Sequence, residues 1–530
     1  MKLPVENVLF ESLVCTPFER TVAWTAPPQT FSIALTCSDY KRSRYSTPNS
    51  RRSFIGTRAR CATRPHDATS RTPKDVSKGV MLLTTSALRG QGPLLLMAAI
   101  PTHARSNSER GLKLPHLSLL VSALLPLDPA THPPHPIMSD LEARVQKILD
   151  DATSSGGPVG CTFAAIDRKG EILVNVASGY EELGNHSRPA KPDSLYCLYS
   201  CTKAIATIAV MQLVEQGKIS LDDHVGDKVL QVAAATLADG TKPNKPITLR
   251  HLLTHTAGFG YTFFSPELKR WSERAGIDEF AGTLEGITSP LIAQPGEDWN
   301  YGVNIDWAGI YLEKVTGMTL GAYCKKHVFE PLGADDIEFG LLPQNKDRLV
   351  AMHQRGEDGT MTVRKHLDFT YKSSFDSAGA GCIGSIESYL KCVSILMNDG
   401  VGANGTRILK AETVQQMLQD HLGDVRTFSG ADPMERKIPA ANPELTHPIE
   451  MMPGVKKGWG LSFQILQDDL PHGRKAGSVW WAGLCNNYWQ VDPTSGIATM
   501  ILSQSFPFND PKAIVPWITA EAEVYKSLRG

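Results

Sequence analysis

Regular patterns of apolar and polar residues begin at about Met138. The first is typical of an amphipathic helix, because apolar residues repeat every three or four positions, at Leu141, Val145, Ile148 and Leu149. Ser139 and Glu142 have the spacing of a capping box at the start of this helix. Ordered structure is therefore expected from residue 138 onward.

Strand-like runs follow this helix and recur near the end of the chain. The runs 161–166 and 171–177 flank one turn, and 487–491 and 497–502 flank another. A final helix is expected after Asp510, because Asp is a good N-cap and Pro511 suits the first helical position. We predict an α+β domain over 138–530, with one antiparallel sheet built from both of its ends, helices packed on the sheet, and a helical insertion over roughly 190–440.

The residues before Met138 differ in composition from the rest. Residues 1–137 hold 15 of the 35 prolines, and 17 Lys and Arg against 8 Asp and Glu give them a net charge of +9. The remaining residues have a net charge of −10, so the total of −1 hides a division of the chain. A segment rich in Pro, Ser and Arg buries too little apolar surface to fold. We expect a disordered or mispredicted extension there, with a transit peptide as the alternative.

Composition also excludes several classes of protein. A net charge near zero argues against a nucleic-acid binder that relies on charge. The apolar runs 93–100 and 117–127 are shorter than the roughly 20 residues that cross a bilayer, and the N-terminus lacks the apolar core of a secretory signal. The ten cysteines have no Cys-x-x-Cys spacing, which favours a reducing compartment. We expect an intracellular, cytoplasmic protein with no membrane or nucleic-acid partner.

The candidate chemistry begins with Ser200 and Lys203. A Ser and a Lys three positions apart on a helix share a face, and a helix start favours negative charge on the Ser oxygen. The apolar run 204–214 predicts a buried helix, and burial lowers the pKa of a lysine toward that of a useful base. The spacing alone is weak evidence, because it recurs at 38–41 and 388–391, the latter on an ordinary amphipathic helix.

Three other patterns are weaker still. Gly379-x-Gly381-x-x-Gly384 matches a dinucleotide fingerprint, but no apolar strand precedes it, so we expect a tight loop capped into a helix by Ser385. His251 and His255 have the spacing of zinc ligands without the Glu of a His-Glu-x-x-His site. The sequence has no Gly-x-Ser-x-Gly, which argues against an α/β-hydrolase.

Longer motifs identify a family resemblance. The runs 198–203, 212–223 and 251–258 resemble the serine β-lactamase-related family, most closely its class C-like, family VIII-type esterases and the fungal transesterases that acylate polyketides. The resemblance covers residues 138–530 and implies a β-lactamase/penicillin-binding-protein-like fold. It implies that Ser200 is the nucleophile and Lys203 its lysine, with no metal and no cofactor.

The same resemblance assigns two further motifs. Tyr301 after the Pro-Gly turn is expected to be the general base and later the acid, although the β-lactamase pattern wants Asn two residues on, where this sequence has Val303. Trp481-Ala482-Gly483 stands where β-lactamases have Lys-Thr-Gly. The resemblance implies an oxyanion hole from the backbone N–H groups of Ser200 and Leu484. Trp481 has no charge, so the partner for a β-lactam or peptide carboxylate is missing.

These observations predict a cofactor-free serine enzyme that forms an acyl-Ser200 intermediate from an ester or thioester. Its partners would be a small-molecule acyl donor and water or an alcohol, in fungal-type secondary metabolism. The sequence leaves open whether the enzyme is an esterase or a transesterase. The alternatives are a β-lactamase or D-Ala peptidase-like hydrolase, and a non-catalytic binding protein on the same fold. Aromatic loop residues could wall a pocket for a bulky acceptor, or could equally be core residues: Tyr261, Phe263, Phe264, Trp299, Trp480 and Trp481.

Overall fold

The computed structural model describes residues 140–371, 373–429 and 432–529. The expectations for residues 1–137, and the capping role of Ser139, lie outside the described residues. The amphipathic helix expected after Met138 is α1 (Asp140–Ser154), with Val145 and Leu149 fully buried.

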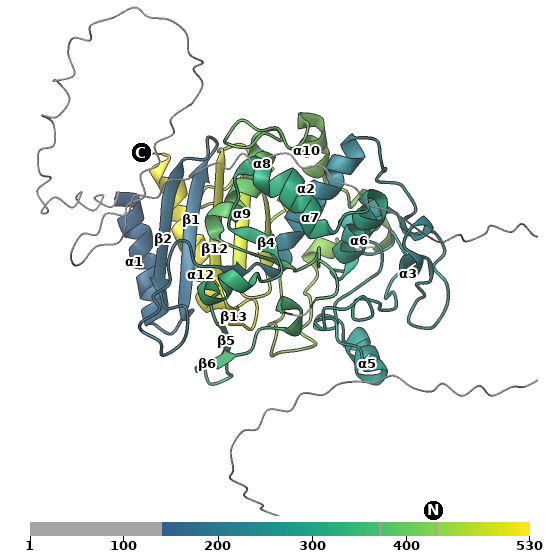
Figure 1. Ribbon diagram of the computed structural model, residues 1–530, viewed down its shortest axis with the longest axis horizontal. Helices are drawn as coiled ribbons and strands as arrows, with labels where there is room; N and C mark the ends of the chain where they lie inside the picture. Colours follow the sequence, from purple (N-terminus) through teal and green to yellow (C-terminus); the bar gives the residue numbers. More distant parts are fainter. Residues whose placement is uncertain (1–139, 372, 430–431, 530) are drawn as a thin grey trace, which may run out of the picture. The chain divides into compact units, whose positions relative to one another are not determined.

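A seven-stranded antiparallel sheet forms the centre of the fold (Figure 1). The two strands from the start of the domain lie at one edge and the five from its end follow, in the order β2-β1-β12-β11-β10-β9-β8. Their bounds are β1 (Gly160–Asp167), β2 (Ile172–Gly179), β8 (Lys457–Trp459), β9 (Gln464–Leu466), β10 (Val479–Gly483), β11 (Asn487–Asp492) and β12 (Ile497–Ser503). The pairing of β1 with β12, from Cys161 opposite Ser503 to Asp167 opposite Ile497, joins the two ends as the sequence predicts.

Helices cover both faces of this sheet. One face packs against α1 and the C-terminal helix α12 (Pro511–Ser527), and the other packs against α2 (Thr202–Glu215) and α9 (Ile386–Val393) (Figure 1). A strand covered on both faces has no solvent side, which explains why β1 reads as a nearly continuous apolar run. The α12 helix begins as expected, because the Asp510 side chain accepts a hydrogen bond from the N–H of Lys512.

The regular structure of the insertion between β2 and β8 is mainly helical, as expected. The insertion also contributes short strands to two small sheets. One sheet has the order β3-β7-β4, and the other joins β13 to β5 and β6. Strands of two to four residues carry too little periodicity to be detected in a sequence. Their bounds are β3 (Tyr196–Cys197), β4 (Ile337–Phe339), β5 (Met352–Arg355), β6 (Met361–Arg364), β7 (Cys382–Gly384) and β13 (Ser505–Phe506).

The helices of the insertion are mostly short. Apart from α2, α6 is the one helix of the insertion, within the described ranges, that is as long as three turns, and its residues 304–312 are buried. They are α3 (Leu230–Ala233), α4 (Leu249–Leu253), α5 (Pro266–Ala275), α6 (Asn304–Thr316), α7 (Leu320–Cys324), α8 (Glu330–Leu332), α10 (Ala411–Met417) and α11 (Gly423–Ser429).

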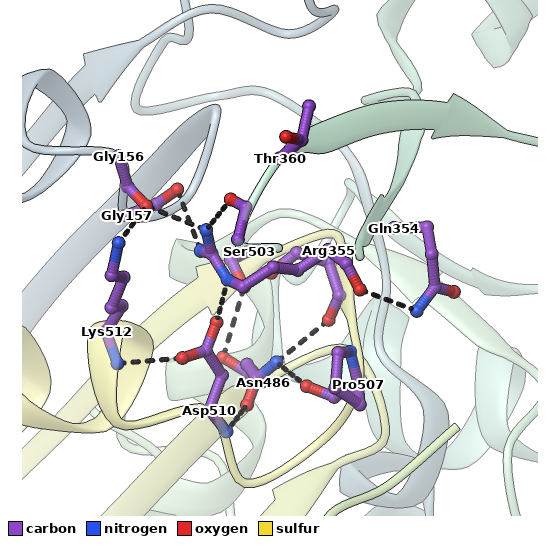
Figure 2. A network of polar contacts seen from close by, with 12 residues as sticks. Gly156, Gly157, Gln354, Arg355, Thr360, Asn486, Ser503, Pro507, Asp510 and Lys512 are labelled. Atoms are coloured by element: carbon purple, nitrogen blue, oxygen red, sulfur yellow. Dashed lines mark hydrogen bonds and ion pairs between the residues drawn. The ribbon is translucent and has the colours of Figure 1, made fainter. Parts of the chain in front are cut away.

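A buried polar network anchors the start of α12 (Figure 2). The Arg355 guanidinium pairs with Asp510 at 2.7 Å and donates to the carbonyls of Gly156 and Gly157 at 2.8 and 3.1 Å. The Asn486 amide accepts from the N–H of Asp510 and donates to two carbonyls of the 505–507 segment. The network therefore connects the α1–β1 turn, β5 and α12 to the turn between β10 and β11.

Candidate active site

Ser200 lies at the junction of β3 and α2. The carbonyl of Cys197, at the end of β3, accepts hydrogen bonds from the side chains of Asn487 and Gln504 at 2.9 and 3.0 Å. Tyr199 has a φ of 46°, a left-handed conformation that is costly for a tyrosine and turns the chain sharply before the helix. Ser200 is thereby placed in the short 3-10 turn η1 (Tyr199–Cys201) that leads into α2.

Lys203 is fully buried one turn along from Ser200. Its Nζ lies 3.1 Å from the Ser200 Oγ, 3.0 Å from the Tyr261 hydroxyl and 2.9 Å from the Gly379 carbonyl oxygen. Burial disfavours the charged amine and lowers the pKa of Lys203 to about 7, against the opposing effect of Asp306. A neutral amine in this place has a lone pair and can accept the proton of the Ser200 hydroxyl.

Tyr301 lies between the lysine and β10. Its hydroxyl accepts a hydrogen bond of 2.8 Å from the indole N–H of Trp481, and the Lys203 Nζ lies 4.8 Å from its ring centroid. Burial raises the pKa of Tyr301 well above its usual value, and the nearby Ser200 and Trp481 side chains oppose this rise only in part. The phenol is therefore neutral at physiological pH, which makes it a donor rather than a base in the resting site.

Tyr261 lines cavities, as the sequence suggests for a pocket-wall aromatic, and it has a second role as well. The structure also puts its hydroxyl on the Lys203 amine. The contact joins residues 58 positions apart, and no local spacing in the sequence encodes it. Tyr261 therefore belongs to the immediate surroundings of the lysine.

His255 supports the Tyr301 loop and does not pair with His251. Its Nδ1 accepts from the Asn304 side chain at 3.0 Å and from the Gly302 N–H at 3.4 Å, and its carbonyl accepts from the Asn300 N–H at 2.8 Å. Burial lowers the pKa of His255 well below its usual value, so the ring is neutral. Asn304 lies one place late for the β-lactamase pattern, and its side-chain NH₂ group is hydrogen-bonded within this buried scaffold.

His251 and the glycine-rich run are accounted for by local structure. His251 forms the capping box of α4 together with Thr248. Ser385 caps α9 as the sequence predicts, and in addition the carbonyl of Gly379 accepts from Lys203. Within residues 140–371, 373–429 and 432–529, no group of three or more His, Cys, Asp or Glu residues could hold a metal ion.

The end of β10 lies against the nucleophile turn. A Cβ placed on Gly483 would come within 2.4 Å of the Leu198 carbonyl oxygen, so only glycine permits this approach. Leu484 follows directly and lines the space around Ser200. The two backbone groups expected to form the oxyanion hole, those of Ser200 and Leu484, thus border the same space.

A cavity of about 260 Å³ opens beside Ser200 and Tyr301. Its walls come from the 263–264 segment, the 438–452 segment, residues 480–484 of β10 and its following turn, and the first half of α12. Glu450 is the one formally charged side chain among the described residues that line it. Trp481, Ala482 and Gly483 belong to this wall as expected. Trp299 and Tyr261 do not, and both line a separate cavity of about 140 Å³ that also borders Tyr301. Tyr261 in addition lines a smaller cavity of about 40 Å³ that borders Ser200 and Leu484.

The chain was also compared with known proteins. A family model described as Beta-lactamase matches residues 145–523. Among curated proteins, the ML-236A carboxylate methylbutanoyltransferase of Penicillium citrinum is 32% identical over 340 residues, which cover 61% of this chain and 78% of that protein. The lovastatin esterase of Penicillium rubens is 30% identical over 359 residues, which cover 64% of this chain and 87% of that protein.

A solved structure has the same architecture. A mutant simvastatin synthase from Aspergillus terreus aligns with a TM-score of 0.63 at 27% identity, covering 74% of this chain and 99% of that one. The sheet with its helical layers is therefore the fold that the sequence resemblance implies. Separately, no helix in the described ranges has both the length and the apolar character needed to cross a membrane.

Proposed function

This chain belongs to the β-lactamase family, and from that premise we propose that it transfers acyl groups through an ester formed on Ser200. Its relatives include named acyltransferases and esterases, and the chain is an acyl-transfer enzyme of this kind. The observation that carries the proposal is the fully buried Lys203 amine, 3.1 Å from the Ser200 hydroxyl at the mouth of an apolar cavity.

In the first half-reaction, Lys203 is the base. The neutral amine takes the Ser200 proton as Oγ attacks the carbonyl carbon, and the N–H groups of Ser200 and Leu484 stabilise the oxyanion. The intermediate collapses, and the neutral phenol of Tyr301 protonates the leaving group. The sequence resemblance suggests Tyr301 as the first base. The lowered pKa of Lys203 and the raised pKa of Tyr301 instead favour Lys203 as the base and Tyr301 as the acid.

The second half-reaction reverses these proton transfers. The acyl-enzyme holds a Tyr301 phenolate beside a Lys203 ammonium, so the site keeps its total charge. The phenolate takes the proton of the incoming alcohol or water, whose oxygen attacks the acyl carbonyl. Lys203 then returns its proton to the Ser200 oxygen as the product ester or acid leaves.

The surroundings favour an uncharged, apolar acceptor. Aromatic and aliphatic side chains wall the larger cavity, and this supports a bulky alcohol in place of water as the acyl acceptor. Two relatives are named methylbutanoyltransferases of ML-236A carboxylate and of monacolin J acid, and we extend a small-molecule acyl acceptor of secondary metabolism to this chain. The donor would be a small-molecule ester or thioester.

A β-lactamase or peptidase activity has less support. The indole of Trp481 occupies the place of a lysine, and its N–H is engaged by Tyr301. Val303 replaces the expected Asn, and the Asn304 side chain is fully buried against His255 and the Phe259 carbonyl. At these two motif positions the chain therefore lacks the lysine that would bind a β-lactam carboxylate and the Asn that would bind the β-lactam amide.

Mass spectrometry of the intact protein tests the proposed intermediate. After incubation with an activated acyl thioester, we expect one acyl group on the peptide that bears Ser200, and none in Ser200→Ala. Ser388→Ala is the matched control, because Ser388 has the same spacing to a lysine but its hydroxyl accepts from the Asp336 N–H and is not among the residues that line the cavities at Ser200. Labelling of Ser200→Ala equal to that of the wild type would refute the mechanism.

Product analysis then separates the two possible fates of the acyl group. The acylated enzyme is supplied with a bulky apolar alcohol, and ester and free acid are quantified. We expect the ester to dominate at saturating alcohol. Free acid as the sole product at every alcohol concentration would make the enzyme a hydrolase.

A further inference from the structure

We propose that Asp306 is a positioning residue for the catalytic lysine. Through the backbone of Gly379 it orients the Lys203 amine, and its negative charge stabilises the ammonium that forms when this amine takes the Ser200 proton. The inference rests on the proposed acyl-Ser200 mechanism, and it adds a residue to which no sequence motif assigns a role.

Asp306 lies in the first turn of α6 and is only 3% exposed. Its Oδ1 accepts hydrogen bonds from the Ser377 hydroxyl at 2.7 Å and from the Gly379 N–H at 2.9 Å. A Cβ placed on Gly379 would come within 2.3 Å of the Asp306 Oδ2, so only a glycine lets the carboxylate approach the backbone this closely. The carboxylate therefore fixes the backbone of Gly379.

Gly379 connects this carboxylate to the lysine. Its N–H donates to Asp306, and its carbonyl oxygen accepts from the Lys203 Nζ at 2.9 Å. A carbonyl can only accept, so one amine N–H is always directed to it. The lone pair of the neutral amine is then left for its two hydroxyl partners, Ser200 at 3.1 Å and Tyr261 at 3.0 Å. The Gly379 carbonyl thereby turns the base toward the nucleophile.

The same loop also holds the backbone on both sides of the nucleophile. The Cys382 carbonyl accepts from the Leu198 N–H at 2.9 Å, and the Cys382 N–H donates to the Thr202 Oγ1 at 3.0 Å. The strand β7, which contains Cys382, also pairs with β3 just before the nucleophile turn. The glycine-rich run 379–384 is therefore a support on which the nucleophile turn and the lysine amine are both placed.

Asp306 brings a negative charge to surroundings of the Lys203 amine that are otherwise neutral. The other titratable side chains that contact or act on this amine, within the described residues, are three acids and one base. Burial keeps all four uncharged at physiological pH, because it raises the pKa of the acids above their usual values and lowers the pKa of the base: Cys201, Tyr261 and Tyr301 are the acids, and His255 is the base.

The charge of Asp306 favours the protonated form of the lysine. Burial lowers the pKa of Lys203 to about 7, and Asp306 opposes this fall. Burial in turn raises the pKa of Asp306, and the charge of Lys203 opposes that rise first among several contacts. The amine is therefore neutral often enough to take the proton of the nucleophile, and the ammonium that results has a buried counter-charge.

Asp306→Asn tests the charge while it retains the shape. The amide oxygen can still accept from Gly379, but the negative charge is gone. We expect the acid-side midpoint of kcat/KM for acylation to move down by about 1 in pH, because the ammonium loses its counter-charge. We expect the plateau to fall by roughly tenfold, because the amine becomes a weaker base. The ratio of variant to wild-type kcat/KM should therefore rise as the pH is lowered from about 8 to about 5.5, whereas a merely structural loss would reduce kcat/KM by the same factor at each pH.

Asp376→Asn is the matched control. Asp376 lies one residue before Ser377 in the same loop, but its carboxylate accepts from the Gly321 N–H at 2.8 Å and is not among the groups that shift the pKa of Lys203. We expect this variant to keep the wild-type midpoint. Circular dichroism checks the folding of each variant, and Asp306→Ser, which also removes the charge, serves if Asp306→Asn does not fold.

The midpoint of the pH–rate profile decides the test. A midpoint that stays in place or rises when the charge of Asp306 is removed, or one that moves as far in Asp376→Asn, would overturn the role of Asp306. Absence of an acyl adduct on Ser200 in the wild type would instead refute the proposed function itself.

Discussion

At the scale of single residues, the proposed mechanism depends on the ionisation of Lys203. Burial lowers the pKa of this lysine to about 7, so the fraction of neutral amine rises as the pH passes through neutrality. We therefore predict that kcat/KM for acylation increases with pH and levels off above about pH 7.5. In Lys203→Ala we expect kcat/KM to fall by roughly 10²–10⁴-fold and this pH dependence to disappear. Steady-state ester turnover between pH 5 and 9 checks both.

The same lysine affects the pH dependence of stability. Between about pH 7 and 10.5 the folded chain holds Lys203 neutral while the unfolded chain protonates it, so the free energy of unfolding should rise with pH in this window. Lys203→Met should remove this rise, as measured by urea unfolding at pH 7 and 9. A wild-type pH–rate profile that is flat from pH 5 to 9 would contradict the role given to Lys203.

Trp481 tunes Tyr301 through a single hydrogen bond. Trp481→Phe keeps an aromatic wall but removes the indole N–H that lies 2.8 Å from the phenol oxygen. Loss of a bond of about 1 kcal/mol that supports the phenolate should lower kcat by roughly fivefold to tenfold, with little change in KM. Trp480→Phe is the comparison, since its N–H bonds Gln464 instead, and a smaller loss of kcat is expected. Equal losses in the two variants would contradict the role of this bond.

Glu279 adds a second titration within the smaller cavity. Burial raises the pKa of its carboxyl to about 7 from 4.5, so between these values the folded chain binds more protons than the unfolded one. Stability due to this group is therefore lost as the pH rises from about 4.5 to 7. We predict that Glu279→Gln gains free energy of unfolding relative to the wild type at pH 8 but not at pH 4.5, as measured by urea unfolding. Glu285→Gln, at an exposed position, is the control, and an equal effect at both pH values would contradict the prediction.

The sequence predicts some residues of the site better than others. Ser200 and Lys203 are one helical turn apart, so local spacing alone brings them together, as the 3.1 Å contact confirms. The prediction of Tyr301 depended on the family resemblance, because the loop that carries Tyr301 reaches the site through tertiary packing around His255. The contact of Tyr261 with Lys203 and the smaller cavity could not be predicted, because they depend on segments near 199, 263, 280, 303 and 369 that only the fold brings together.

At the scale of secondary-structure elements, long and strongly patterned segments were predictable and short ones were not. The helices α1 and α12 and the strands β1, β2, β11 and β12 lie where apolar periodicity and turn residues place them. Strands β8 and β9 have three residues each and are buried on both faces, so they show no alternation. Tertiary pairing, rather than local preference, forms such strands.

The Arg355 network joins several of these elements and should contribute strongly to stability. In Arg355→Met the Asp510 carboxylate stays buried without its partner, and we expect the free energy of unfolding to drop by about 3–5 kcal/mol. Lys147→Met removes an exposed pair with Asp151 and should cost about 1 kcal/mol or less. Urea unfolding of both variants is the measurement. A loss for Arg355→Met no greater than that of the control would contradict this view of the network.

At the scale of the whole molecule, the sheet explains how distant parts of the chain build one site. The pairing of β1 with β12 brings both ends of the domain to its centre, and β10 and α12 then meet the insertion that carries Ser200 and Tyr301. The larger cavity is therefore built from residues between 200 and 518. A mutation in α12 can change the choice of acceptor although it lies more than 300 residues from the nucleophile.

The charge division of the chain leads to a prediction about residues 1–137. The described strands of the central sheet and the described walls of the cavities at Ser200 lie between residues 160 and 518, and we propose that residues 138–530 form the catalytic unit on their own. Deletion of residues 1–137 removes a net charge of +9 and leaves −10. We expect the shortened chain to keep kcat/KM for short acyl esters within about twofold and its free energy of unfolding within about 0.5 kcal/mol, because the deletion leaves the proposed catalytic unit whole. At pH 7 it should bind an anion exchanger more tightly than the full chain does, because its net charge is more negative. Ester turnover and urea unfolding of both chains decide the matter: a loss of folded, active enzyme on truncation would mean that the first 137 residues belong to the domain.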